Sequence, residues 1–198
     1  MVGAHYALYR TDNRFLISLF GVHLPTGSIN ERGETPAGAH QKLPYPMQLG
    51  SGTFDLHTGL TFVDQRTNWS WGAHADGRWG LGMNPNQYRL GALYHGGAWL
   101  TRRLKEWVAL TLRVDMHRRE TIHGADPDLN PNMVPTADPD LLDETHIEFL
   151  PILDFYAPRG LLKGHRLSIQ TRFPLYETHE AMHLETSLEL IVGWQVTF

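Results

Sequence analysis

The chain has 198 residues, 17 Lys and Arg against 21 Asp and Glu, and a formal net charge of −4. This length suits one domain, and the acidic balance excludes the basic surface that nucleic-acid binding requires. The absence of cysteine excludes disulfides, thiolate metal sites and cysteine nucleophiles, and no apolar run approaches the ~18 residues of a membrane-spanning helix.

Apolar and polar residues alternate with a period of two along most of the chain, which is typical of β-strands. The alternation is clearest over 54–62, 69–79, 167–175 and 184–198. Nine strands are predicted, over about 2–11, 14–24, 54–62, 69–79, 87–99, 106–117, 145–156, 167–175 and 184–198.

The predicted connections alternate in length between short and long. The short ones are 12–13, 64–67, 101–105 and 157–164, and the long ones are 25–52, 80–86, 118–144 and 176–183. Strands of about 9–13 residues exceed the usual 5–6 of globular proteins and match those of outer-membrane barrels, which also alternate short and long connections. The sequence therefore predicts an all-β, antiparallel, transmembrane up-and-down β-barrel in one domain spanning 1–198, with long outer loops at 25–52 and 118–144.

The odd number of strands predicts that the chain is part of a longer protein. Single-chain bacterial barrels have an even number of strands and both ends in the periplasm, so we expect further strands before Met1 and about twelve in the full-length protein. The first residues also lack the basic and apolar regions of a signal peptide. We therefore expect a signal peptide upstream of Met1 and a location in the outer membrane of a Gram-negative bacterium.

The last residues have large apolar side chains at alternate positions and end on an aromatic one. Gly193, Trp194, Val196 and Phe198 resemble the C-terminal signal that the outer-membrane assembly machinery recognises. The alternative is an ordinary edge strand, which is disfavoured because an unpaired apolar strand promotes aggregation.

The polar faces of the predicted strands carry many ionisable residues. We expect them to line the lumen: Asp55, His57, His74, Asp76, Arg78, Arg166, Arg172, Glu185 and Glu189. There they would control passage through a pore or pair with one another to hold the barrel together. In a soluble barrel the same residues would form the solvated outside.

Aromatic residues fall near the ends of the predicted strands, where membrane barrels carry interfacial girdles. They are Trp69, Trp71, Trp79, Tyr88, Trp99, Trp107, Phe155, Tyr156, Phe173, Tyr176, Trp194 and Phe198. The alternative is a soluble core with scattered aromatic residues.

The 12 histidines are spread along the chain, and only His179 and His183 are closely spaced, in a predicted loop. Without a helix this spacing supports no zinc motif, so scattered hydrogen-bonding histidines are favoured and no metal or cofactor is expected. Loop 118–144 contains a near-repeat, ADPDL at 125–129 and 137–141. Its oxygens would suit Ca²⁺, but it lacks the Gly and final Glu of an EF-hand, and a proline-stiffened acidic loop is the simpler interpretation.

No enzyme motif is present. The sequence contains no nucleophile elbow, HExxH, Walker loop or Rossmann fingerprint. We therefore expect a protein that is not an enzyme.

Several short runs resemble a known family. LPTGSI at 24–29, LPYPMQLGSGT at 43–53, NPNMVPTADP at 130–139, GHRL at 164–167 and the terminal GWQVTF resemble sequences of the outer-membrane proteins named for the meta-pathway of phenol degradation. The resemblance covers about residues 14–198. It implies a transporter barrel distantly similar to the fatty-acid and toluene uptake channels, with no catalytic residues to carry over.

These patterns predict an outer-membrane channel for the passive diffusion of small, hydrophobic or aromatic compounds. The expected partners are outer-membrane lipid and lipopolysaccharide, the barrel-assembly machinery and the solute itself. Two alternatives remain open: a non-transporting barrel with a structural or surface-binding role, and a soluble β-barrel that binds a lipophilic ligand. Conductance would separate the first alternative from a channel, and solubility without detergent would identify the second.

Overall fold

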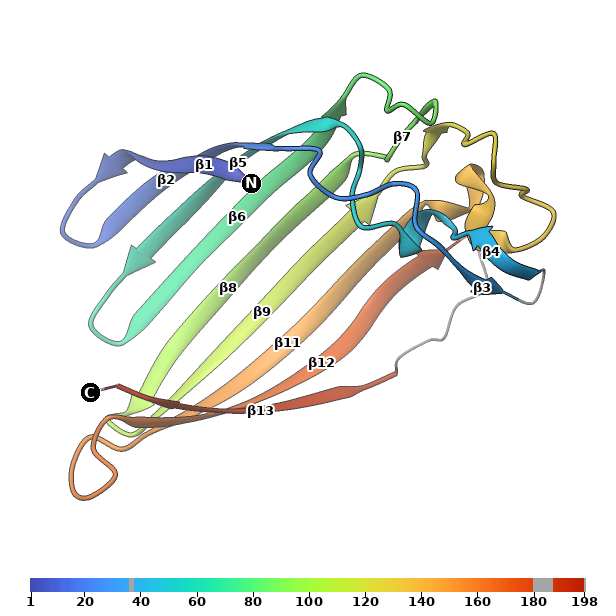
Figure 1. Ribbon diagram of the computed structural model, residues 1–198. Helices are drawn as coiled ribbons and strands as arrows, with labels where there is room; N and C mark the ends of the chain where they lie inside the picture. The colour runs from blue at the N-terminus through green and yellow to red at the C-terminus, as the bar shows by residue number, and fades with distance from the viewer. Residues whose placement is uncertain (36–37, 180–186, 198) are drawn as a thin grey trace.

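One antiparallel sheet dominates the computed structural model, which describes residues 1–35, 38–179 and 187–197. Within these residues the sheet has nine strands, and their spatial order follows the chain (Figure 1). They are β1 (Val2–Arg10), β2 (Arg14–His23), β5 (Phe54–Gln65), β6 (Trp69–Leu81), β8 (Leu93–Lys105), β9 (Val108–Arg119), β11 (Glu144–Tyr156), β12 (His165–His179) and β13 (Glu189–Val196). The prediction of an all-β fold with nine antiparallel strands is confirmed.

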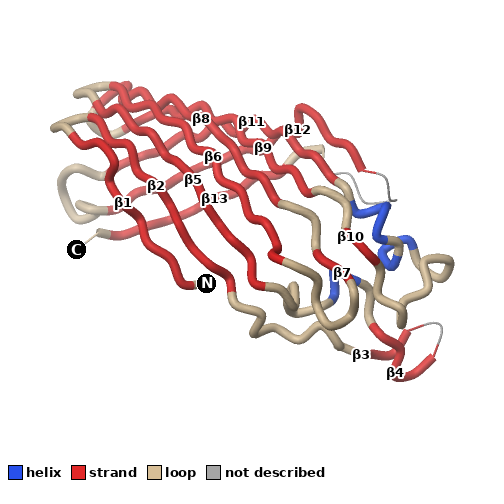
Figure 2. Tube along the Cα trace, turned by 90° about the horizontal axis from the view of Figure 1, so that it is seen from above, coloured by secondary structure: helices blue, strands red, loops and turns tan. Residues whose placement is uncertain are grey.

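The remaining elements are short and belong to the long connections. They are β3 (Arg32–Thr35), β4 (Gly38–Lys42), β7 (Tyr88–Arg89), β10 (His123–Gly124) and the 3-10 turns η1 (Tyr45–Met47), η2 (Pro135–Ala137) and η3 (Pro139–Leu142). All gather at one end of the sheet (Figure 2). We call the described residues of 24–53, 82–92 and 120–143 the loop cap. Among the described residues, no helix is long and apolar enough to cross a membrane.

Several predicted boundaries are wrong. The strand predicted over 87–99 is interrupted after β7 and resumes as β8, which continues to Lys105 through the predicted turn 101–105. The Arg102 guanidinium lies over the Trp69 ring, 4.8 Å from its centroid, and strand pairing continues through this segment. The predicted link 176–183 is also wrong at its start, because β12 runs through His179.

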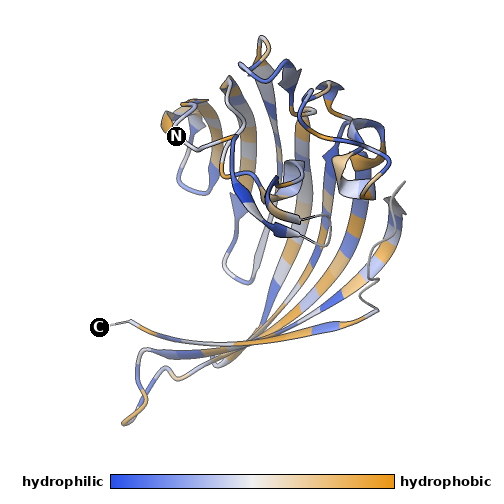
Figure 3. Cartoon of the chain, turned by 45° about the vertical axis from the view of Figure 1, so that its right-hand side comes forward, coloured by the Kyte–Doolittle hydropathy of each residue, from blue (hydrophilic) through white to orange (hydrophobic). Residues whose placement is uncertain are grey.

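The two faces of the sheet differ sharply in polarity. Successive residues of a strand point to opposite faces, and the register aligns apolar with apolar positions across neighbouring strands, as at Leu100↔Leu112 and Val114↔Phe149. We call the face that carries these apolar positions the apolar face and the other one the polar face. Large side chains on the apolar face are exposed, among them Phe20, Leu60, Trp71, Leu100, Val114, Phe173, Val192 and Trp194. Figure 3 shows the resulting bands along the strands.

The apolar core of the described residues lies in the loop cap instead of against the sheet. Tyr45, Tyr88 and Ile122 are buried together, with three leucines packed around them. The rings of Tyr45 and Tyr88 meet edge to face, 4.9 Å apart. The three long connections therefore form one packed unit at one end of the strands.

The sheet has two edges in the described part of the chain, β1 and β13, and no described pairing joins them. Because nine strands alternate in direction, β1 and β13 run the same way. An all-antiparallel closure between them requires an odd number of additional strands, since each antiparallel neighbour reverses the direction.

Candidate functional site

The polar face carries a row of ionisable side chains that crosses five strands. The register places Asp76 opposite His95, His95 opposite His117, His117 opposite His146 and His146 opposite Glu177. Side chains directly opposite one another on one face lie about 5 Å apart. Residues separated by a hundred positions in the sequence thus form one continuous line.

Hydrogen bonds extend this line to β2 and β5. A single oxygen of Asp76, Oδ2, lies 2.9 Å from His57 Nε2 and 3.1 Å from His95 Nδ1. Because an ionised carboxylate only accepts, both imidazoles donate to it. His57 can then accept at Nδ1 from His23 Nε2, which lies 3.5 Å away. We call the set the histidine belt; it comprises His23, His57, Asp76, His95, His117, Glu144, His146 and Glu177.

The other half of the belt is held by ring contacts and carboxylates. The rings of His95 and His117 lie 4.7 Å apart with a 30° tilt, and those of His117 and His146 lie 6.2 Å apart. Glu144 lies within 3.8 Å of both His117 and His146. On the far side His146 lies 3.6 Å from Glu177.

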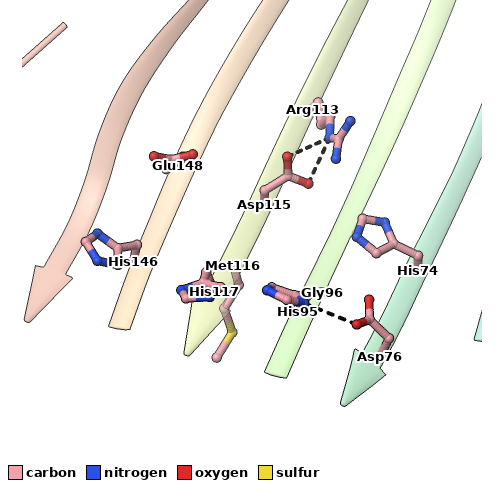
Figure 4. A pocket seen from close by; sticks show the side chains of 10 residues that line it. All are labelled: His74, Asp76, His95, Gly96, Arg113, Asp115, Met116, His117, His146 and Glu148. Carbon is pink, nitrogen blue, oxygen red and sulfur yellow. Dashed lines mark hydrogen bonds and ion pairs between the residues drawn. The ribbon is translucent and has the colours of Figure 1, made fainter. Parts of the chain in front are cut away.

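A hollow of about 480 Å³ opens beside the belt. Its lining includes His74, Arg113, Asp115 and Glu148 as well as belt residues, all drawn in Figure 4. Side chains from four adjacent strands surround it, so the polar face is the concave face of the sheet. Gly97 helps to keep it open, because a Cβ there would lie 2.2 Å from Asp115 Oδ1 and 2.7 Å from His74 Cε1.

Near the short turns, buried carboxylates hold the strand ends together. Asp154 is 2% exposed and accepts two hydrogen bonds from Arg166, at 3.0 and 2.9 Å, and one from Ser168. Asp64, 3% exposed, accepts from Arg14 at 2.8 Å and from Arg66 at 2.7 and 3.1 Å. These contacts satisfy the buried charges, as burial requires.

The loop cap contains a buried ion pair. Lys42 Nζ lies 2.6 Å from Asp126 Oδ2, and both side chains are almost fully buried. The Tyr45 hydroxyl accepts a hydrogen bond from the Asp126 backbone amide at 2.9 Å. Burial raises the pKa of Tyr45, and it raises the pKa of Tyr88 to about 12.

The acidic near-repeat forms the same local turn twice. Asp126 Oδ1 accepts from the Asp128 amide, and Asp138 Oδ1 accepts from the Asp140 amide, each at 3.0 Å. The Asp126 carboxylate is therefore already used by Lys42 and by its own turn. In the described part of the chain, no group of three or more His, Asp and Glu residues is arranged to hold a metal ion.

The described residues proposed from sequence to line the lumen share the concave face. They are Asp55, His57, His74, Asp76, Arg78, Arg166, Arg172 and Glu189; Glu185 lies outside the described residues. Arg78 lies 3.8 Å from Asp55, and Arg172 lies 2.9 Å from Glu189. The structure thus brings most of them together, in contact with one another.

Sequence reasoning missed nine of the twelve ionisable residues that the belt and the hollow comprise: His23, His95, Arg113, Asp115, His117, Glu144, His146, Glu148 and Glu177. Treating the histidines as scattered is wrong for His23, His57, His95, His117 and His146, which the register gathers into one belt. The sequence signal for this pairing is the number of residues that separates each histidine from the turn of its hairpin. His95 and His117 each lie eleven residues from Glu106, so a hairpin centred there pairs them.

The residues of the proposed assembly signal lie on the edge strand β13 as far as they are described. Trp194 and Val196 are on the apolar face, Gly193 on the concave one, and Phe198 lies outside the described residues. Trp194 is 72% exposed, and its Nε1 donates to His165 Nδ1 at 3.0 Å.

Two of the aromatic residues predicted for interfacial girdles lie elsewhere. Tyr88 is 1% exposed in the core of the loop cap, and Trp99 lies on the concave face opposite Gly72. By contrast, Trp69 and Trp71 are exposed on the apolar face. The girdle prediction fails for Tyr88 because period-two alternation does not reveal how loops pack. It fails for Trp99 because the strand that contains this residue was predicted with the wrong bounds, so its face could not be assigned.

No model of a known protein family matches this chain, and no curated protein sequence matches it. The family resemblance drawn from short motifs therefore stays a prediction.

Proposed function

We propose that this chain forms the wall of an outer-membrane β-barrel whose concave face lines a path for small solutes. The main support for this proposal is the difference in polarity between the two faces. Ionisable groups line the hollow, whereas exposed large apolar side chains cover the other face. Soluble proteins rarely expose contiguous apolar areas of more than a few hundred Å², but lipid requires such a surface.

The turn end of the sheet supports a membrane setting. Four cations lie over aromatic rings there: Arg10 over Phe15, Arg102 over Trp69, Lys105 over Trp107 and Arg166 over Tyr156. Aromatic rings and long basic side chains concentrate at membrane interfaces, where an apolar stem and a charged head are both accommodated. We place the short turns at the periplasmic interface and the loop cap on the outer side.

The motif resemblance implies hydrophobic or aromatic solutes, and the chemistry of the hollow favours aromatic ones. A pure hydrocarbon would displace water from charged groups without replacing its hydrogen bonds. A small aromatic solute with polar substituents could hydrogen-bond to those groups and stack on the rings of His95, His117 and Trp99. Passage would be passive diffusion along this face.

The packed loop cap favours a second candidate, a barrel that does not transport. Its buried core and the Lys42–Asp126 pair would close the outer mouth permanently. Such a protein would have a structural or surface-binding role.

Solute flux in liposomes tests the proposal. The protein is reconstituted, and uptake of small aromatic solutes is compared between wild type, Gly97→Phe and Gly96→Phe. Gly97→Phe fills the hollow and should reduce flux several-fold. Gly96 borders the hollow with its backbone, but it lies in register with Ala75 and Met116 on the apolar face. It is the matched control because a side chain there points away from the hollow and its Cβ meets nothing nearer than the His74 carbonyl oxygen, at 3.7 Å.

Folding of each variant is verified by its electrophoretic shift on heating, which distinguishes folded barrels from unfolded chains. Folded wild type without flux would overturn the channel and favour the non-transporting barrel. Equal flux in wild type and Gly97→Phe would show that the solute path does not pass through the hollow.

A further inference from the structure

The permanent charges around the histidine belt do not balance. The described carboxylates on this part of the concave face are Asp55, Asp76, Asp115, Glu144, Glu148, Glu177 and Glu189. The described cations that do not depend on imidazole are Arg78, Arg113, Arg119, Arg172 and Arg89, whose side chain lies beside Gly80 on this face. Carboxylates are in excess, so this face is negative while the imidazoles are neutral.

Four of these arginines are already next to a carboxylate. Arg78 lies 3.8 Å from Asp55, Arg113 2.6 Å from Asp115 and Arg119 3.5 Å from Glu144. Arg172 lies between Glu148, at 3.4 Å, and Glu189, at 2.9 Å. The close partners of Asp76, in contrast, are two imidazoles. The variable part of the charge therefore resides in the histidines.

Enough histidines surround the hollow to reverse its charge. His74, His95, His117 and His146 line the hollow, and His57 and His23 continue the belt from Asp76 towards β2. His5 of the edge strand lies in the same register row through Leu19 and Gly59. Free imidazole has a pKa of about 6.5, so its charge changes in mildly acidic solution. Protonation of any three of these imidazoles would outweigh the excess of two carboxylates, and the face would then be positive.

We propose that the histidine belt sets the charge selectivity of the path: small cations pass preferentially at neutral pH and small anions in mild acid. This inference rests on the proposed channel. Rings of charged side chains select ions by sign, and a concave face with low-dielectric walls strengthens their field. Figure 4 shows the imidazoles and carboxylates facing one hollow, where every permeating ion would meet them.

Reversal potentials across a planar bilayer with a KCl gradient test the inference. Wild type should prefer K⁺ at pH 7.5 and Cl⁻ at pH 5, so the reversal potential changes sign. His95→Gln combined with His117→Gln and His146→Gln removes three of the six imidazoles, so its reversal potential should change much less between the two pH values than that of wild type. Asp76→Asn should weaken the K⁺ preference at pH 7.5.

The matched control is His40→Gln with His123→Gln, two exposed histidines of the loop cap, which should reverse as wild type does. If the triple variant does not fold, single His117→Gln replaces it. Its reversal potential should change less between the two pH values than that of wild type. Ion currents with the same selectivity at both pH values would overturn the inference and leave the channel standing. Folded protein without currents would overturn the channel itself and the inference with it.

Discussion

Lys42 has a long basic side chain that is nearly fully buried in a cap made only of connections. Its Nζ contacts Asp126 Oδ2 at 2.6 Å and lies 3.7 Å from Asp128. Taking both charges out of water is costly, and the pair persists because each charge satisfies the other. At the residue scale, this buried ion pair is one of the contacts that link connection 24–53 to connection 120–143, beside the Tyr45–Asp126 hydrogen bond.

Removing either partner of this pair should destabilise the cap strongly. Lys42→Met leaves the Asp126 carboxylate buried without its cation, and we expect a cost of about 3–5 kcal/mol. Limited proteolysis, with amide hydrogen exchange of the cap, measures the loss. Lys42→Met combined with Asp126→Leu should recover part of it, because no charge is then left unpaired. Equal protection in wild type and Lys42→Met would contradict a stabilising role.

Alkaline pH should loosen the cap at the two buried tyrosines. Burial favours the neutral phenol, so the pKa of Tyr88 is raised to about 12 from the ordinary 10.0. This contribution to stability is fully present below pH 10 and is lost as the pH rises towards 12. Absorbance at 295 nm should show exposed tyrosines ionising first, and Tyr88→Phe should remove the latest step. A single transition near pH 10 for all tyrosines would contradict the burial of Tyr88.

At the scale of elements, the strands and their polar faces could be predicted from the sequence, but the register between neighbouring strands could not. Alternation identified the nine strands and their polar faces, because a period of two is a local property. It could not align them, since register depends on where each turn lies. Placing the turn at 101–105 instead of around Glu106 misaligned β8 with β9, and the line through His95 and His117 was lost. The loop cap was equally hidden, because its packing joins distant segments with no periodic pattern.

A strand glycine provides a test of packing on the concave face. A Cβ at Gly72 would lie 2.4 Å from the Trp99 ring and 2.5 Å from the Phe62 carbonyl oxygen. Gly72→Ala should therefore displace Trp99 and cost about 1–3 kcal/mol. Gly193 is the matched control, since its Cβ would meet nothing within 4 Å, and Gly193→Ala should be neutral or stabilising by up to about 1 kcal/mol. Urea unfolding in detergent compares them, and equal midpoints would argue against this packing.

At the scale of the whole molecule, the two faces of the sheet differ in the surroundings that suit them. Its concave face gathers charges around a hollow, its other face exposes large apolar side chains, and its turn end combines cations with aromatic rings. A soluble barrel would need the opposite arrangement, with apolar side chains inside. If lipid surrounds the sheet, the edges at β1 and β13, which no described pairing joins, would have to be paired, because unpaired backbone groups cannot remain in lipid.

Two neighbouring residues at the centre of β5 test which face meets lipid. Leu60 is 51% exposed on the apolar face, whereas Thr61 points to the concave face opposite His74. If lipid surrounds the apolar face, Leu60→Lys places a charge near the bilayer midplane and should cost about 2–4 kcal/mol. Thr61→Lys should cost much less because its charge remains in water. If water surrounds the protein instead, Leu60→Lys should change the stability by less than about 0.5 kcal/mol. Reversible urea unfolding in lipid vesicles measures both variants, and similar small costs for the two would rule out a lipid-facing surface at Leu60.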